Sequence, residues 1–183
     1  MSEKIQEIPA GAGLHKIAQG EGRPFDIAGA HFTWKARNED TGHAFSLYEM
    51  ELEPGEGVPL HCHPYVEVFY ILAGEVEFFR PAEDGDRWIA ASCGETVIVP
   101  INGLHAFYNR SRSPARLLSV SNQLHQPLFD ALDDLDKVEP FSAFPMPEAM
   151  GRFAALAKTY GMHFLPFQPP SSTEDANDNH VLE

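Results

Sequence analysis

Four side chains in two short stretches of this chain have the types and spacing of metal ligands. His61, His63 and Glu67 lie in the stretch HCHPYVE, and His105 lies later, in PINGLHAFYN. Two histidines two residues apart on a strand project from the same face, because side chains alternate along a strand. Neutral imidazoles with one carboxylate bind Fe, Mn, Ni, Cu or Zn as divalent ions. The four residues therefore predict one metal site with mixed nitrogen and oxygen ligands.

The ligand set also indicates what kind of metal site to expect. Four protein ligands of an octahedral set would leave two neighbouring positions for a substrate, or for a substrate and dioxygen. Structural zinc sites are instead closed at four ligands and commonly use cysteine. The pattern favours a catalytic site, with Glu67 as the catalytic residue as well as a ligand. The alternative is a protein that keeps its ion without turnover.

The composition restricts the partners that this protein could have. With 183 residues the chain is long enough for one well-packed domain. Its net charge of −14 argues against binding to nucleic acid or to an anionic membrane, because both would repel it. The first residues lack a basic segment followed by an apolar run, and no stretch approaches the ~20 apolar residues of a transmembrane helix. A cytoplasmic protein that binds a small-molecule substrate is predicted.

The segments that must position the four ligands are typical of short strands. Apolar and polar residues alternate along them, and many short strands at regular spacing predict a sandwich or barrel. Pro64 interrupts the strand that carries His61 and His63, so we expect Glu67 to open a new strand. The expected strands are 31–34, 44–52, 58–63, 68–72, 75–79, 88–91, 96–99, 106–108 and 115–120.

The last part of the chain changes character. Apolar residues at helical spacing predict helices over 127–135 and 147–160, with Pro147 in the first turn of the second helix and Gly161 just past its end. We expect these helices to pack against the outside or the mouth of the barrel; a lid over the metal pocket is the alternative. The expected organisation is an N-terminal arm (1–24), a barrel (25–125), a C-terminal helical segment (126–168) and a disordered polar tail (169–183).

Strand alternation also predicts the lining of a pocket beside the metal. Residues two and four positions from Glu67 or His105 on the same strand should share their inward direction. On the strand 44–52 the even positions form the more apolar set and the expected inner face. The predicted pocket is mostly hydrophobic and aromatic, with Tyr48 as a polar group, although the same residues would also fill any small barrel. The expected lining is Tyr48, Met50, Phe69, Ile71 and Phe107.

The remaining histidines lack partners at ligand spacing. We expect each of them on the surface or satisfied within the fold: His15, His31, His43, His125 and His163. Phe79 and Trp88 lie on strands expected at one face of the barrel, where a second copy of the chain could pair, so a homodimer is also expected.

The two stretches together closely resemble the paired motifs of the cupin superfamily. The residues that carry the resemblance are Gly55, His61, His63, Glu67 and Gly74 in the first stretch, and Gly94, Pro100, His105 and Asn109 in the second. The resemblance places His61, His63, Glu67 and His105 at the family's metal-ligand positions. Asn102 departs from the glycine often found two residues after the proline, but asparagine also tolerates a left-handed backbone. The implied fold is all-β, a cupin double-stranded β-helix or jelly-roll barrel with short C-terminal helices.

The HxHxxxE order and the stretch VFYILAGEVEFF look like single-domain cupins (cupin 2 type) related to quercetin dioxygenases. This resemblance implies a metal-dependent oxidoreductase, a dioxygenase acting on a small oxygen-rich or aromatic compound, with Fe(II) as the expected ion. Mn, Ni, Cu and Zn remain alternatives to Fe(II) as the bound ion.

Two other functions stay open. One is a metal-dependent isomerase, lyase or decarboxylase of a small acid or sugar, which would need a basic residue in the pocket. The other is a non-catalytic small-molecule-binding protein.

Overall fold

The computed structural model describes residues 13–27, 30–81 and 87–166, and within them the chain forms mainly strands. The strands are β1 (Arg23–Ile27), β2 (Ala30–Ala36), β3 (Phe45–Leu52), β4 (Gly57–Cys62), β5 (Glu67–Ala73), β6 (Glu75–Arg80), β7 (Arg87–Ser92), β8 (Thr96–Val99), β9 (His105–Tyr108), β10 (Ala115–Asn122) and β11 (His163–Phe164). The α-helices are α1 (His125–Val138) and α2 (Met146–Thr159), and the short 3-10 helices are η1 (Asn38–Thr41) and η2 (Phe141–Ala143).

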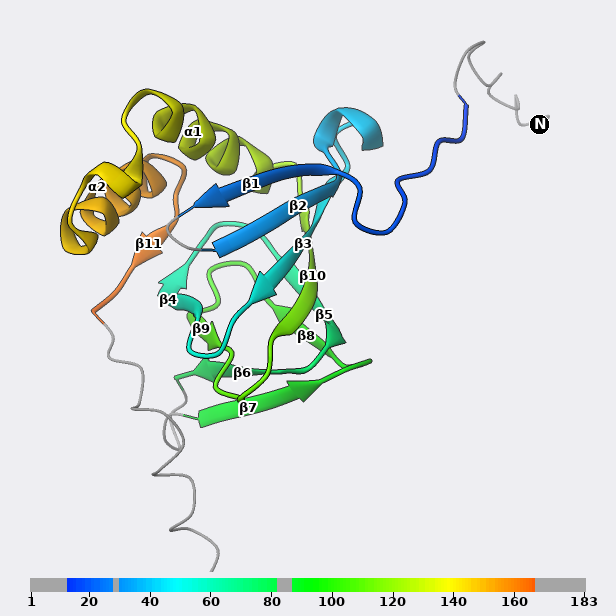
Figure 1. The fold of residues 1–183 in the computed structure, drawn as a ribbon, viewed down its shortest axis with the longest axis horizontal. Coiled ribbons are helices and arrows are strands. Elements are labelled where there is room, and N and C mark those ends of the chain that lie inside the picture. Colours follow the sequence, from blue (N-terminus) through cyan, green and yellow to red (C-terminus); the bar gives the residue numbers. More distant parts are fainter. Residues whose placement is uncertain (1–12, 28–29, 82–86, 167–183) are drawn as a thin grey trace, which may run out of the picture.

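Two antiparallel sheets enclose the core (Figure 1). One sheet has the order β1-β2-β3-β10-β5-β8, and the other has the order β11-β4-β9-β6-β7. Neighbouring strands are often far apart in sequence, as β3 and β10 are, which is the pattern of a jelly roll. The predicted all-β jelly-roll fold with short C-terminal helices is therefore confirmed.

Strand alternation separates the inner from the outer face of the sheets. Along β3 the even positions, including Tyr48 and Met50, are buried, as the sequence pattern predicts. On β5, Phe69 and Ile71 are fully buried, and Leu117 of β10 joins them in the core. Glu67 opens β5, as expected from the break at Pro64.

Each strand expected from the sequence overlaps an observed strand, but β1 begins inside the segment expected to be an arm. Its sequence, RPFDI, is too short and too polar to show a clear strand pattern. It is held by tertiary packing, because the ring of Phe25 stacks on those of Phe32 and Trp34 at 4.7 and 5.3 Å between centroids. The tail expected to be disordered, 169–183, lies outside the described residues.

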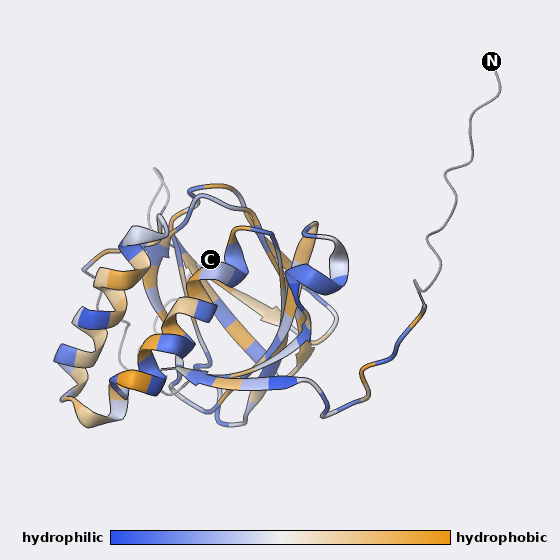
Figure 2. Cartoon of the chain, turned by 90° about the horizontal axis from the view of Figure 1, so that it is seen from above, coloured by the Kyte–Doolittle hydropathy of each residue, from blue (hydrophilic) through white to orange (hydrophobic). Residues whose placement is uncertain are grey.

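The C-terminal helices lie together on one side of the barrel (Figures 1 and 2). Both expose hydrophilic residues and turn apolar ones inward; α1 buries Leu128 and Leu132 completely. Pro147 lies in the first turn of α2, and Gly161 follows its end with a φ of 80°, so both helix-end predictions are confirmed. The chain then returns to the barrel as β11, which pairs with β4.

Two further expectations concern the surface of the protein. Among the described residues, no helix is both long and apolar enough to cross a membrane. Phe79 is buried and its ring lies 5.2 Å from that of Trp88, so these two side chains pack on each other within one copy. Pairing with a second copy at this face stays a prediction.

Candidate metal centre

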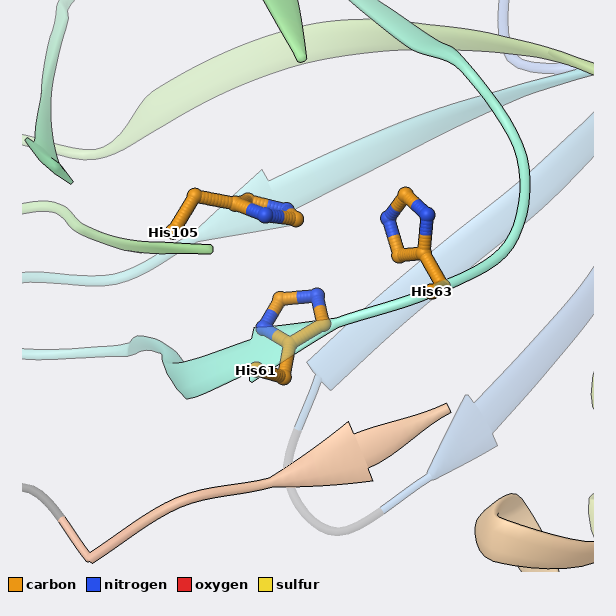
Figure 3. Close-up of side chains that lie close together, drawn as sticks. All are labelled: His61, His63 and His105. Carbon is orange, nitrogen blue, oxygen red and sulfur yellow. The ribbon is translucent and has the colours of Figure 1, made fainter. Parts of the chain in front are cut away.

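Three histidines from two neighbouring strands converge inside the barrel. His61 lies on β4, His63 directly follows that strand, and His105 opens β9. His61 and His105 are direct cross-strand partners with ring centroids 4.1 Å apart. The three residues are buried, one ligand atom from each lies within 4.8 Å of the others, and Figure 3 shows the rings turned toward one another. The two predicted stretches are thus brought together at one point.

Each of these rings is oriented by a hydrogen bond from Nδ1 to a backbone carbonyl. The acceptors are Pro59 for His61, Tyr65 for His63 and Gly103 for His105, at 2.8, 2.9 and 2.8 Å. A carbonyl only accepts, so Nδ1 carries the hydrogen and Nε2 is the nitrogen left for an ion. Nε2 of His105 is buried without a hydrogen-bond partner, which is costly for a polar atom unless a ligand takes it up. The three histidines therefore fit a metal ion.

Glu67 joins this group through His63. Its Oε2 lies 3.0 Å from Nε2 of His63, and its Oε1 accepts hydrogen bonds from Ser119 Oγ at 2.5 Å and Tyr48 Oη at 3.2 Å. The carboxylate is buried, with 4% of its surface exposed. The group whose ligand atoms lie within 4.8 Å of one another comprises the three histidines, and the Glu67 carboxylate lies beside it in contact with His63.

His125 also faces Glu67, and here the sequence-based expectation is wrong. It is 1% exposed, its Nε2 lies 3.6 Å from Oε1 of Glu67, and its Nδ1 is buried without a hydrogen-bond partner among the described residues. Its ring stacks on that of Tyr48 with centroids 5.1 Å apart. The signal that could have found it is helical spacing, because it lies three and four residues before the buried Leu128 and Phe129. The other four histidines are exposed, as expected: His15, His31, His43 and His163.

Burial sets the charges in this region. It lowers the pKa of His61 to about 3 and that of His125 to about 4, and it lowers the pKa of His105 as well. Burial alone would raise the pKa of Glu67, but the hydrogen bond from His63 and the charges of the nearby histidines outweigh it and hold that pKa well below its usual range. At neutral pH the carboxylate of Glu67 is therefore ionised and the imidazoles of His61 and His105 are neutral, which is the protonation state that metal binding requires of these groups.

The turn of the second stretch is tied to the first stretch. Asn102 adopts a left-handed backbone with a φ of 59°, so asparagine supports this turn in place of glycine. Its backbone N–H donates to the carbonyl of His63 at 2.8 Å. Asn109 is fully buried, and its side-chain amide donates to the carbonyls of Leu52 and Ser113, each at 2.8 Å. These contacts hold the strand of His105 in place against the strand of His61.

A cavity of about 110 Å³ lies beside the centre, between the barrel and the C-terminal segment. Aromatic and apolar side chains make up most of its wall, and no lysine or arginine is among the described residues that line it. The lining comprises Phe32, Tyr48, Met50, Gly57, Val58, Pro59, His61, Glu67, Phe107, His125, Phe129, Met150, Phe153, Met162 and Phe164.

Three of the five residues expected to line the pocket do so, namely Tyr48, Met50 and Phe107. Phe69 and Ile71 do not border this cavity. They point inward as expected, but they lie in the core, where Phe69 packs against Phe78 and Phe107 with centroids 5.3 and 5.0 Å apart. Alternation gives the face on which a side chain lies but not its depth in the barrel.

The C-terminal segment forms one wall of the cavity. Met150 and Phe153 reach it from α2, and Met162 and Phe164 reach it from the chain that follows. Phe164 pairs with His61 across the β4–β11 ladder, and the two rings stack with centroids 5.4 Å apart. The segment therefore contacts the centre directly and covers it on this side.

The jelly-roll fold, the buried histidine cluster and the motif spacing are those expected of a cupin domain. Residues 48–121 match the family model Cupin_2, described as a cupin domain. The fold and the motifs agree with this match, and together they support the cupin superfamily.

The chain is also similar to parts of several solved structures. A cupin-like protein from Thermotoga maritima is 20% identical, with a TM-score of 0.45, and the match covers 52% of this chain and 70% of that one. The DMSP lyase DddQ from Ruegeria pomeroyi is 26% identical, with a TM-score of 0.39; the match covers 44% of this chain and 39% of the lyase. A Thermus thermophilus protein, TT1209, is 30% identical, with a TM-score of 0.39 and coverage of 44% and 73%. The comparison with curated protein sequences found no match.

Proposed function

We propose that the chain is a metal-dependent cupin enzyme in which His61, His63, Glu67 and His105 hold one divalent transition ion. The donor chemistry supports this, because three oriented imidazoles and one ionised carboxylate are buried together and Nε2 of His105 has no protein partner. Fe(II) is the proposed ion; Mn, Ni, Cu and Zn suit the same donors. When bound, such an ion would supply Lewis-acid chemistry to an oxygen atom of the substrate and redox chemistry with dioxygen.

The proposed reaction is the oxygenation of a small oxygen-rich or aromatic compound, and the cavity is the observation that carries this proposal. Its apolar wall would exclude water and hold a flat, uncharged ring or enol, whereas a phosphorylated sugar would require lysine or arginine. A cavity of about 150 Å³ holds benzene in another protein. At about 110 Å³, this cavity is smaller than that one, so the ligand is expected to be no larger than one small ring. A catechol or a β-diketone therefore fits better than a three-ring flavonol.

The chain's own residues would position such a substrate and manage its protons. His61 and Glu67 are polar residues of the cavity wall, and the aromatic ring of Phe164 stacks on that of His61. Glu67 is the proposed catalytic residue as well as a ligand, because its ionised carboxylate borders the cavity and could accept a proton from a substrate bound there.

Oxygen uptake tests this proposal directly. The protein would be purified without added metal, analysed for its elements, loaded with Fe(II) under anaerobic conditions, and mixed with catechol, acetylacetone and a flavonol in aerated buffer. We expect uptake with catechol or acetylacetone and none with the flavonol. His105→Ala, which removes one donor, should lose both metal and uptake, whereas the exposed His163→Ala should keep both. A flat oxygen trace for metal-loaded protein with every compound would contradict the oxygenase proposal.

His125 favours a second candidate, a metal-dependent lyase or isomerase of a small acid. Such a reaction needs a base in the cavity, and His125 is a cavity-lining imidazole whose pKa is lowered to about 4 by burial, so it is neutral and able to accept a proton at neutral pH. This candidate predicts product under strictly anaerobic conditions. A thermal shift on ligand addition with no product in either atmosphere would instead indicate a binding protein.

A further inference from the structure

The two oxygen atoms of the Glu67 carboxylate have different surroundings. Oε1 lies 2.5 Å from Ser119 Oγ and 3.2 Å from Tyr48 Oη, both of which donate to it. It also lies 3.6 Å from Nε2 of His125. Oε2, in contrast, faces only the metal cluster in the contacts among described residues, through Nε2 of His63 at 3.0 Å. One oxygen is therefore engaged by the wall of the barrel, and the other is turned toward the histidines.

His125 is the member of this set that does not come from the barrel. It is the first residue of α1, which begins shortly after β10 ends at Asn122. Its ring is fixed on several sides by aromatic rings, with centroids 5.1 Å from Tyr48, 4.8 Å from Phe129 and 5.3 Å from Tyr65. A ring packed in this way cannot turn freely, so the direction of its Nε2 toward Glu67 is set by the fold.

The start of α1 is itself anchored to the barrel by a buried polar network. The side-chain oxygen of Gln126 accepts from the backbone N–H of Asn38 at 2.6 Å, and the side-chain amide of Asn38 donates to the carbonyl of Gln123 at 2.9 Å. Asn38 and Gln126 are both buried. The helix therefore cannot shift along its axis without breaking these bonds, and the position of His125 over the carboxylate is secured.

We propose that His125 is a positioning residue of the metal centre: Ser119 and Tyr48 donate hydrogen bonds to Oε1 of Glu67, and the ring of His125 packs against that oxygen with Nε2 3.6 Å away, so that Oε2 is the single oxygen presented to the ion. A carboxylate facing a metal through one oxygen, with the other held by donors, is more rigid than one free to rotate. This inference rests on the proposed metal site. The four proposed ligands all come from the barrel. The inference adds that α1, in the C-terminal helical segment, helps to orient one of them through His125.

Substitutions that keep or remove the donor test this role. His125→Gln keeps an N–H near the position of Nε2, and His125→Phe keeps the aromatic packing but has no donor. The probe is Co(II), because its visible absorption bands report the number and kind of its ligands. We expect wild-type protein and His125→Gln to give the same Co(II) spectrum. His125→Phe should give a changed spectrum and a Co(II) affinity lower by about 10- to 100-fold, the usual effect of removing a group that orients a metal ligand.

Ser119→Ala provides an independent variant, since it removes the shortest hydrogen bond to the same oxygen. It should change the spectrum in the same direction as His125→Phe. His163→Gln, which alters an exposed histidine of β11, is the matched control and should behave as wild type. Circular dichroism and thermal unfolding would establish that each variant is folded. If His125→Phe does not fold, His125→Asn replaces it, because its shorter amide cannot reach the carboxylate as Gln can.

The outcomes separate this inference from the proposed function. If wild-type protein fails to bind Co(II), the metal site itself is wrong. If wild type binds Co(II) but folded His125→Phe (or His125→Asn) has the wild-type spectrum and affinity, the metal site stands and the positioning role of His125 is overturned. A changed spectrum in that variant and in Ser119→Ala, with a wild-type spectrum in His125→Gln, supports the inference.

Discussion

Oε2 of Glu67 and Nε2 of His63 lie 3.0 Å apart, and the hydrogen bond between them requires one proton. Nδ1 of His63 already donates its hydrogen to the carbonyl of Tyr65. If Nε2 carried no hydrogen, its lone pair would point at a lone pair of the ionised Glu67 carboxylate, and the two would repel each other. A proton therefore lies between the two groups in the ion-free protein. The same two atoms are predicted to bind the metal ion, which would take the place of that proton.

Metal binding is accordingly expected to release about one proton per ion at neutral pH, as ligands must be deprotonated when they bind. Isothermal titration calorimetry in two buffers with different ionisation enthalpies would measure the number released. In Glu67→Gln the amide cannot share a proton in this way, so its proton release should be smaller and its affinity weaker. A binding enthalpy that does not depend on the buffer would contradict the shared proton.

The ion-free protein is expected to lose stability in acid because its buried histidines are held neutral. Burial lowers the pKa of His61 from 6.5 to about 3 and that of His125 from 6.5 to about 4. Below pH 6.5 the unfolded chain therefore binds protons that the folded chain does not, and stability falls as the pH falls toward the folded-state values. For each such histidine, the free energy of unfolding falls by up to about 1.4 kcal/mol for every pH unit between its unfolded-state and folded-state pKa values. The lowered pKa of Glu67 acts in the same direction, below about pH 4.5.

Urea unfolding of ion-free protein at pH 7.5, 6.0 and 4.5 would measure this dependence. In His125→Gln one titrating group is removed, so the slope of stability against pH should be smaller than in wild type. His163→Gln removes an exposed histidine and should leave the slope unchanged. Equal stability of the wild-type protein at pH 7.5 and 4.5 would show that these histidines are not held neutral by the fold.

The sequence predicts the fold and the metal cluster well, because both depend on local patterns. Alternation on β3 gives the buried face that includes Tyr48 and Met50, and two histidines on one strand must share a side. The cross-strand pairing of His61 with His105 follows once the jelly-roll topology is known. Periodicity and turn chemistry predict the strands, whereas the jelly-roll topology is implied by the resemblance of the two motifs to the cupin superfamily.

What the sequence does not give is the packing of the C-terminal segment on the centre. His125 belongs to no motif, and its position over Glu67 depends on where α1 docks. The pairing of β11 with β4 involves only two residues and has no periodic pattern to reveal it. The depth of Phe69 and Ile71 below the cavity likewise depends on the tilt of β5 in the barrel. Such contacts between distant segments arise from tertiary packing and leave no local signal.

The size of the cavity is expected to limit the ligand, and Met162 is the side chain with which to test this. Met162 is buried and lines the cavity. Met162→Ala should enlarge the cavity and allow binding of a two-ring ligand such as naphthalenediol, at a cost of about 2–5 kcal/mol in stability. Binding would be measured by calorimetry on metal-loaded protein, with catechol as the one-ring reference.

Leu117→Ala is the matched control for the cavity variant, since Leu117 is fully buried but does not line the cavity. It should lose a comparable amount of stability while keeping the preference of wild type for one ring. Tight binding of naphthalenediol to the wild-type protein would show that the wall formed by the C-terminal segment opens readily, as the alternative of a lid predicts.

Gly57 is expected to be necessary for the close approach of the two strands that carry His61 and His105. A Cβ atom built at Gly57 would overlap the carbonyl oxygen of Phe107 and lie 2.6 Å from Cα of Tyr108, so β4 and β9 would have to separate. Gly57→Ala should therefore destabilise the protein by about 1–3 kcal/mol and weaken metal binding, because His61 moves away from its cross-strand partner.

Gly151 is the control, because it lies in the middle of α2 with open space around its Cα. Gly151→Ala should stabilise the protein by about 0.5–1 kcal/mol and leave metal affinity unchanged. Urea unfolding and competition with a metal chelator would measure both quantities, and wild-type metal affinity in Gly57→Ala would show that the strand spacing does not control the centre.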